Sequence, residues 1–586
     1  MQILDRDLEG TFMKHTAKYF LVLAVAAGIG GCAVQPYTFE GGLTGDGGPD
    51  ASGGGGEGGA AGGGGSGGGT IEPKLLQIVV SPHDSLVELD LGKGGSVKYA
   101  ASGKYEGGTE KDLSDVVTWS HSNLEVGSFA SGSNLALAPQ STVGTWMTVV
   151  TAEHEGVQGS ARLSVVSYRK TGPEQDFFFV LPYMDEAGPQ ERMLEFGTDV
   201  PKMDVFFNMD TTGSMGGSIL GLKTSLTKTI IPQVQEQIPD TQFGTGEFQD
   251  FPISPYGATT NQPFRLGQAI TPDGSAVLTA VSGYTAGGGN DPPESMIESL
   301  YQIATGEGLS GPSPTLVAPN KVGVGGVGFR EGTMRVVVTI TDAPSHTVDE
   351  ASNAYIGAVA KVAHTRQQAK DALAAICGRF VGVSVQNGDF AADADTEDFA
   401  IATGSMIPPV AWDSGRPTGC NPGQCCTAIN GAGRVPGESG LCPLVFQTAS
   451  TGSGLGESIT TGLKMLSRYA TFEVITEKDG ETKGENGKPL PAGKTTADLI
   501  RSIKPESYTM PPSPPMVPPP VISPTSFLNV TPGTRVLFSV RAFNDFVTPT
   551  SEAQFFRAVI RVLAGGCAAL DSREVIIMVP PAASSG

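Results

Sequence analysis

The chain of 586 residues is poor in positive charge and in long apolar segments. It has 38 Lys and Arg residues against 60 Asp and Glu residues, which gives a net charge of −22 at pH 7. Nucleic acid repels a protein of this charge, so binding to DNA or RNA is not expected. Apart from the N-terminal segment, no run of about 18 apolar residues occurs, so no other part of the chain is expected to span a membrane.

Sequence motifs of several enzyme classes are also missing. The six histidines are scattered and form no H-E-x-x-H pair. There is no G-x-S-x-G elbow and no phosphate-binding loop with its lysine. Residues 323–328 fit G-x-G-x-x-G, but a strand is indicated after them where a dinucleotide site requires a helix. These absences disfavour an enzyme.

Glycine is the residue in clear excess, with 81 of 586 positions, about twice the usual share. There is no G-X-Y period, so collagen is excluded. Many glycines lie between Gly41 and Gly69. A segment of this composition cannot bury apolar surface, so residues 33–72 are predicted to be a disordered tether.

Residues 1–32 indicate an export signal. The first twelve residues are acidic, whereas Met13 begins a stretch with two lysines and an apolar run, so the true start is predicted at Met13. The run ends in a segment that resembles a bacterial lipobox. This resemblance implies that Cys32 is lipidated and anchors the chain in the cell envelope, with the outer membrane favoured. The alternative is a plain secretory signal.

The other six cysteines form an even set, which predicts disulfide bonds in an exported protein. Their spacing contains no C-x₂-C pair, so structural zinc is the weaker interpretation. The neighbours Cys425 and Cys426 are not expected to bond to each other, so each is expected to pair with Cys420 or Cys442. The disulfide candidates are Cys377, Cys420, Cys425, Cys426, Cys442 and Cys567.

Residues 73–167 contain short β-branched and aromatic runs between Gly, Ser and Asn clusters, which predict a β-sandwich. The strings VSP, VTWSHSN, GTWMTVVTA and GSARLSVV occur there in this order. They resemble the bacterial Ig-like domain of group 2, and this resemblance implies an Ig-like domain. Trp119 is expected to pack in its core.

Residues 201–477 alternate between predicted strands and amphipathic helices. The strands are 203–209, 334–341 and 380–385, and the helices are 219–237, 293–304, 365–377 and 456–469. This alternation predicts an α/β domain with a doubly wound, mostly parallel sheet. A Cys-rich insert is assigned to residues 413–445.

The remaining segments are predicted to be extended. Residues 478–525 are assigned as a Pro-rich linker, and residues 526–586 as a C-terminal β-domain. Because residues 526–582 are few for a sandwich, the β-segment 168–200 is expected to pair with them. The α/β domain would then be an insertion in one β-domain.

The strand at 203–209 is followed by three oxygen-bearing side chains. Asp210, Thr212 and Ser214 occupy positions i, i+2 and i+4 on the turn. Ligands bind at the carboxyl ends of strands in doubly wound sheets, where these side chains can converge. A carboxylate with hydroxyls suits an octahedral divalent cation, Mg²⁺ or Mn²⁺.

The string D-x-[ST]-x-S resembles the metal-ion-dependent adhesion site of von Willebrand factor A domains, and the resemblance covers residues 201–477. The loop 287–294 resembles the one that supplies a distal ligand in that family, and Asp342 matches an acid that closes the site through water. The implied metal ligands are Asp210, Thr212, Ser214, Glu294 and Asp342.

Residues 246–252 resemble an integrin-β segment whose acid binds a second, calcium-type ion. The resemblance implies a neighbouring Ca²⁺ site of Asp250, Asp291 and Glu294. The family has Asn two residues before the position of Asp291, where this chain has Gly289. This departure puts the second site in doubt.

Each candidate ligand also has a simpler interpretation. Thr212 and Ser214 could cap the next helix, and Asp342 could be a cap or a turn residue. Glu294 could be a first-turn acid favoured by the helix dipole. Four unrelated caps need not converge, so a metal site is favoured.

These patterns predict a bacterial cell-envelope lipoprotein that binds a protein partner through a cation, with a partner carboxylate filling an open coordination position. The alternative is a structural or assembly subunit of an envelope complex whose metal stabilises the fold. A metal-dependent hydrolase that uses Asp210 with Asp250 or Asp291 is less favoured, because no strong nucleophile accompanies them.

Overall fold

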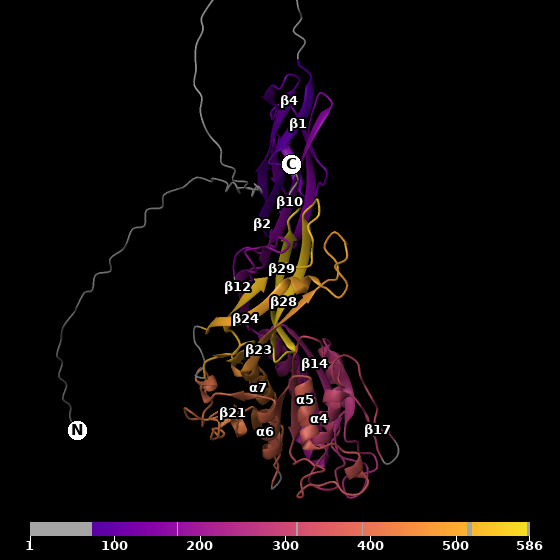
Figure 1. Cartoon of the computed structure of the whole chain (residues 1–586). Helices are drawn as coiled ribbons and strands as arrows, with labels where there is room; N and C mark the ends of the chain where they lie inside the picture. Colours follow the sequence, from indigo (N-terminus) through magenta and orange to yellow (C-terminus); the bar gives the residue numbers. More distant parts are fainter. Residues whose placement is uncertain (1–72, 173, 312–314, 389–390, 512–517, 583–586) are drawn as a thin grey trace, which may run out of the picture.

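The computed structural model describes residues 73–172, 174–311, 315–388, 391–511 and 518–582. The predicted export signal, Cys32 and the tether lie outside these residues. The described chain is elongated, with an all-β part at one end, an α/β part at the other, and the C-terminal strands between them (Figure 1). None of the described helices is long and apolar enough to cross a membrane.

The N-terminal part, residues 73–168, consists of short strands around one apolar core. Its three sheets have the orders β1(Leu75–Ser81)-β4(Ala100–Tyr105)-β5(Glu110–Asp112), β2(Asp84–Asp90)-β10(Val157–Tyr168)-β9(Gly144–His154)-β6(Thr118–His121) and β3(Gly95–Lys98)-β8(Asn134–Leu137)-β7(Gly127–Ser131). Alternate residues of β9 and β10, such as Val150 and Leu163, face the core. Trp119 packs against this core and stacks on Phe129. The predicted β-structure is therefore present, and the Ig-like resemblance stays a prediction.

The middle part, which we call the C-terminal β-domain, combines strands from before and after the α/β part. One sheet has the order β11(Phe177–Val180)-β29(Ala568–Val579)-β28(Gln554–Ala564)-β23(Phe472–Gly480)-β26(Phe527–Val530)-β25(Val521–Ile522), and the other β12(Gln190–Gly197)-β27(Arg535–Ala542)-β24(Ile500–Thr509). β11 pairs with β29, and β12 pairs with β27. The segment 168–200 therefore joins the C-terminal strands, and the α/β part is inserted between them.

The boundaries expected around the Pro-rich segment are wrong. Residues 478–525 are not only a linker, because β24 lies within them and pairs with β27. β23 begins before residue 477 but pairs with β28 and β26, so it belongs to the C-terminal β-domain. Pro505 lies within β24 at an irregularity of the register, where a missing N–H is tolerated.

The α/β part is built on a six-stranded sheet of order β15(Arg265–Thr271)-β14(Asp240–Phe248)-β13(Lys202–Asp210)-β18(Met334–Thr341)-β19(Gly378–Gln386)-β22(Val445–Ala449). All neighbours are parallel except the antiparallel edge strand β15. Successive residues of β13 serve opposite faces, since Val205 and Phe207 join one apolar cluster and Phe206 another. The sheet is therefore buried on both faces.

Helices cover both faces of this sheet. The cluster of Phe207 includes residues of α1(Gly216–Ser225), α2(Ile231–Gln237), α3(Gly274–Gly283) and α7(Leu455–Tyr469). The cluster of Phe206 includes residues of α4(Met296–Thr305), α5(Arg366–Ala375) and α6(Asp393–Ala402). Figure 1 shows α4 and α5 side by side. Two of these helices, α3 and α6, were not predicted.

All six candidate cysteines form disulfides, which confirms the prediction of disulfide bonds. Cys420 bonds to Cys426, and Cys425 to Cys442. These two bonds close the segment 420–442 beside β22. The third bond joins Cys377, which precedes β19, to Cys567, which lies in the turn between β28 and β29. It ties the amino-terminal edge of the parallel sheet to the C-terminal β-domain.

Candidate metal centre

The carboxyl ends of the parallel strands point away from the C-terminal β-domain. The amino ends contact that domain, because Ala569 N–H donates to the Gly332 carbonyl just before β18, and Cys377 is bonded to Cys567 before β19. β13 spans nine residues, which is about 30 Å at 3.3 Å per residue. The side chains after Asp210 therefore lie at the far end of the α/β part, remote from the other domains.

The Asp210 carboxylate is fully buried and oriented by three donors. Its Oδ1 accepts hydrogen bonds from the Thr212 N–H at 2.9 Å and the Thr212 hydroxyl at 2.7 Å. Its Oδ2 accepts one from the Thr341 hydroxyl at 2.7 Å. Thr212 directs its hydroxyl to Asp210 and does not cap the turn η1(Gly213–Met215), in which Ser214 is exposed. The capping interpretation is therefore wrong for Thr212.

Glu294 lies in the loop before α4 and is 4% exposed. Its backbone pairs with the segment after β18, since Glu294 N–H donates to the Pro344 carbonyl at 2.9 Å and His346 N–H donates to the Glu294 carbonyl at 2.8 Å. Because α4 begins at Met296, Glu294 is not a first-turn acid. Its Oε2 is buried and has no hydrogen-bond partner.

Asp342 directly follows β18 and is 3% exposed. Its Oδ2 accepts a hydrogen bond from the Asn387 side-chain amide at 2.9 Å, just beyond the end of β19. The loop 287–289 packs on the turn after β13, because Gly213 N–H donates to the Gly288 carbonyl and Gly287 N–H donates to the Thr211 carbonyl. The sheet thus brings all five predicted ligand positions to one edge.

Burial, together with the charges of neighbouring acids, raises the pKa of Asp210 and of Glu294. Burial, and then the charge of Asp342, raise the pKa of Asp210 to about 7 against stabilising hydrogen bonds from Thr212 and Thr341. Burial raises the pKa of Glu294 to about 12, and the charges of Asp210, Asp250, Asp291 and Asp342 add to this rise. A group of buried carboxylates with this mutual repulsion is stable in its ionised form only beside a cation.

A second group of donors lies beside the first. Asp250, Asp291 and His346 each offer one ligand atom, and these atoms all lie within 4.8 Å of one another. His346 Nε2 is 3.2 Å from Asp291 Oδ2 and 3.5 Å from Asp250 Oδ2. The expected second site therefore gains His346 as a donor, whereas Glu294 is not a member of this group.

His346 has no close histidine partner in the sequence, so patterns of paired histidines do not identify it as a ligand. Its position was a usable signal, since it follows Asp342 by four residues after a predicted strand. The carboxyl ends of neighbouring parallel strands meet at one edge. A lone histidine close behind such a strand therefore lies near the acids of the same edge.

The residues present fit a cation. Buried polar atoms normally have hydrogen-bond partners, but Asp250 Oδ2, Asp291 Oδ1 and Glu294 Oε2 are buried without any. All three orphaned atoms are carboxylate oxygens at this one edge. Oxygen donors of this kind are the ligands that hard divalent cations prefer.

The structure explains the glycine at position 289. Gly289 has φ +72°, and a Cβ there would lie 2.6 Å from Glu294 Oε1 and 3.3 Å from the Thr212 Cβ. A larger residue at this position would push Glu294 and Thr212 apart. The departure from the family pattern therefore coincides with close packing between two candidate ligands.

We expect Gly289→Ala to weaken cation binding about tenfold and to lower the free energy of unfolding by roughly 1–2 kcal/mol, because alanine is strained at positive φ and would displace Glu294. Isothermal titration with Mn²⁺ and thermal melting measure the two effects. Gly287→Ala is the matched control, since a Cβ added at this position would have no atom within 4 Å. Equal effects of the two substitutions would contradict this role of Gly289.

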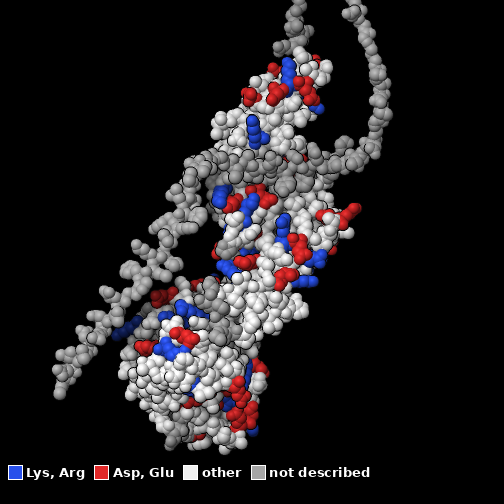
Figure 2. All heavy atoms as spheres, turned by 90° about the vertical axis from the view of Figure 1, so that its left-hand side faces the viewer, with Lys and Arg blue, Asp and Glu red and all other residues white. Residues whose placement is uncertain are grey.

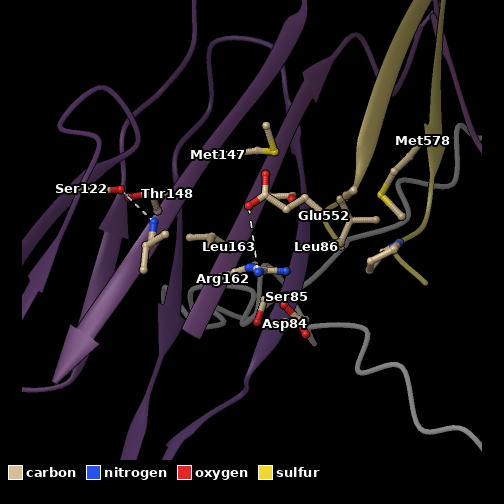
Figure 3. Close-up of a pocket in the computed structure, with 14 residues that line it drawn as sticks. Asp84, Ser85, Leu86, Ser122, Met147, Thr148, Arg162, Leu163, Glu552 and Met578 are labelled. Carbon is tan, nitrogen blue, oxygen red and sulfur yellow. Dashed lines mark hydrogen bonds and ion pairs between the residues drawn. The ribbon is translucent and has the colours of Figure 1, made fainter. Parts of the chain in front are cut away.

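Another hollow lies where the N-terminal part meets the C-terminal β-domain (Figure 3). It is lined by apolar side chains such as Leu86, Met147 and Met578, with the Arg162–Glu552 ion pair at its rim. Its volume is about 150 Å³, below the roughly 300 Å³ of the smallest usual ligand pockets. We therefore interpret this pocket as a feature of the junction between the two parts and not as a ligand site.

Surface charge does not identify the site. On the face shown in Figure 2, Asp and Glu alternate with Lys and Arg along the β-domains, and most of the α/β part is uncharged. The acids of the candidate centre are largely buried, so they are not among these surface charges.

No protein-family model matches the chain, and no curated protein matches it. Among solved structures, a von Willebrand factor type A protein from Catenulispora acidiphila is similar over 70% of this chain and 73% of that one, with 12% identity and a TM-score of 0.28. The pilus adhesin SpaC from Lactobacillus rhamnosus GG, in an open conformation, is similar over 74% of this chain and 52% of that one, with 11% identity and a TM-score of 0.26. These scores are too low to assign a fold or a function.

Proposed function

We propose that this chain binds a protein partner through a divalent cation, Mg²⁺ or Mn²⁺, at the carboxyl end of the parallel sheet. The observation that carries the proposal is the convergence of the buried acids Asp210, Glu294 and Asp342, with the orphaned Oε2 of Glu294 among them. The residues that would hold the ion are Asp210, Thr212, Ser214, Glu294 and Asp342. When bound, the ion supplies a positive centre for an acidic group of the partner.

Some residues of the site position the metal-binding carboxylates, and others leave the site open to a partner. Thr212 and Thr341 hold the Asp210 carboxylate in one orientation, and Asn387 does the same for Asp342. Ser214 and Gly213 are exposed, so a partner can reach this edge from solvent. An octahedral ion with these ligands and waters has a position that a partner carboxylate can fill.

The test is a binding assay from envelope extract with the purified chain in Mg²⁺ and in EDTA. We expect a partner to be retained in Mg²⁺, released by EDTA and lost with Asp210→Ala. Asp371→Ala, an exposed acid on α5, is the matched control and should retain the partner. Circular dichroism verifies that both variants fold. Retention that ignores both EDTA and Asp210→Ala would exclude the proposal.

The second candidate is a structural subunit whose cation only stabilises the fold. The same buried acids favour it, because an ion that relieves their repulsion stabilises the folded chain. The two roles separate in one comparison. A structural role predicts that chelation lowers the melting temperature without a separable defect in partner binding. A catalytic role would require turnover of a substrate, and we do not propose one.

We also propose that the chain is a lipoprotein of a bacterial cell envelope, on the basis of the residues around Cys32. Detergent phase partition of the full chain tests this. The wild type is expected in the detergent phase, because several buried acyl chains anchor a protein firmly. Cys32→Ser cannot be lipidated at this position and is expected in the aqueous phase. Equal partition of both would rule out lipidation at Cys32.

A further inference from the structure

We propose that Asp250, Asp291 and His346 form a second cation site that takes a zinc-class transition metal ion through the imidazole nitrogen. The site differs from the expected calcium site in its ligands and in its ion. It does not depend on the first ion, because none of its three ligands belongs to the set around Asp210.

The hydrogen bonding of His346 directs one ring nitrogen into the cluster. Its Nδ1 lies 2.9 Å from the Asn353 carbonyl oxygen, and a carbonyl oxygen can only accept, so Nδ1 carries a proton. In the neutral ring, Nε2 then presents a lone pair to Asp250 and Asp291. A proton on Nε2 would be donated to Asp291 Oδ2 at 3.2 Å; without that proton, a lone pair that faces two carboxylate oxygens is unfavourable unless a cation lies between them.

Two of the three ligands, His346 and Asp250, are held in place by further contacts. The His346 ring is 4% exposed and stacks on Tyr355 at 4.4 Å, with Tyr256 edge-on at 5.0 Å. The Tyr355 hydroxyl and the Phe251 N–H both donate to Asp250 Oδ1 at 2.6 Å. Metal-binding histidines usually donate their other N–H to a carbonyl or carboxylate, and metal-binding carboxylates are likewise hydrogen-bonded.

The free atoms lie at the spacing of a metal site. Asp250 is fully buried, and its Oδ2 has no hydrogen-bond partner, as is true of Asp291 Oδ1. Two ligands bonded to one ion at about 2.1 Å stand roughly 3.0–3.4 Å apart at octahedral or tetrahedral angles. His346 Nε2 is 3.2 Å and 3.5 Å from the two carboxylates, so little movement is needed.

The donor set decides the class of ion. Ca²⁺ and Mg²⁺ take oxygen ligands, whereas imidazole suits zinc, copper, iron and nickel. Zinc binds imidazole nitrogen and carboxylate oxygen, and catalytic zinc sites combine the two ligand types. The three ligands come from the loops after β14, before α4 and after β18, so this ion would join the loops that also carry Glu294 and Asp342.

Optical titration of the chelator-stripped full chain with Co²⁺ tests the proposal, with Zn²⁺ and Ca²⁺ as competitors. In Asp210→Ala, which lacks the first site, we expect one equivalent of Co²⁺ to bind, Zn²⁺ to displace it and Ca²⁺ not to do so at equal concentration. His346→Gln should weaken Co²⁺ binding at least tenfold. His364→Gln is the matched control, because His364 contacts the buried Glu298 away from the cluster, and it should leave Co²⁺ binding unchanged.

Further measurements separate this site from the first. Asp210→Ala should retain the Co²⁺ signal even though it loses the Mg²⁺-dependent partner, so failure of one proposal is distinguishable from failure of the other. X-ray absorption of the wild type loaded with one equivalent of Zn²⁺ should show imidazole scattering, and it needs no variant. Unchanged Co²⁺ binding in His346→Gln, tighter binding of Ca²⁺ than of Co²⁺, or absence of imidazole scattering would show that His346 forms only an ion pair with the two acids.

Discussion

Removal of divalent cations is expected to make the stability of this protein fall as the pH rises from 5 to 8. In the unfolded chain Asp and Glu ionise near pH 4. In the folded chain burial raises the pKa of Asp210 to about 7 and that of Glu294 further, to about 12. Above pH 4 the folded state therefore holds protons that the unfolded state has released.

The direction in which the free energy of unfolding changes with pH follows from proton linkage. Where the folded state binds more protons than the unfolded state, the free energy of unfolding decreases with pH by about 1.4 kcal/mol per unit for each such proton. Asp210 contributes this slope between about pH 4 and 7, and Glu294 continues it to higher pH. The expected total loss from pH 5 to 8 is on the order of 6–7 kcal/mol, with about 2.6 from Asp210 and about 4 from Glu294.

Thermal melts in EDTA and in Mg²⁺, at several pH values, measure this loss. With the ion bound, the carboxylates are ionised and compensated, so the Mg²⁺ melts should depend little on pH. The gap between the two series should widen as the pH rises. A chelated protein that is equally stable at pH 5 and pH 8 would show that these acids carry another compensating charge.

The order of strands along the chain was enough to predict the edge at which the site lies. Asp210 and Asp342 each directly follow a buried strand, and parallel strands place such residues together. Four predicted helices correspond to the segment 216–237 and to α4, α5 and α7. α3 and α6 were missed because Gly, Ser and acidic residues weaken their apolar periodicity.

The features that failed depend on contacts between distant segments. β24 lies in a Pro-rich stretch, and only its pairing with β27 makes it a strand. His346 joins Asp250 and Asp291 across 55 to 96 positions of sequence, and it is turned toward them by Asn353 and Tyr355. Its place behind a predicted strand locates His346 at this edge, but local patterns hold no information about the contacts that turn its ring toward the acids.

The substitution Asp210→Asn is expected to change stability in opposite directions with and without the ion. In EDTA at pH 8 the wild type bears an ionised, buried Asp210 whose usual pKa of 3.8 is raised to about 7. This shift corresponds to a cost of up to about 4 kcal/mol. The neutral amide avoids the cost and can still accept from Thr212, so the variant should be more stable by up to that amount.

In saturating Mg²⁺ the order should reverse, because the amide supplies no negative charge to the ion and the variant gains little from it. Below about pH 4 in EDTA the two proteins should be nearly equal, since Asp210 is then protonated in both the folded and the unfolded state, and this comparison is the internal control. If Asp210→Asn were destabilising in EDTA at pH 8, Asp210 would be a structural hydrogen-bond acceptor and not a charge held for a cation. The reversal therefore tests, without any knowledge of the partner, whether this buried charge is kept for an ion.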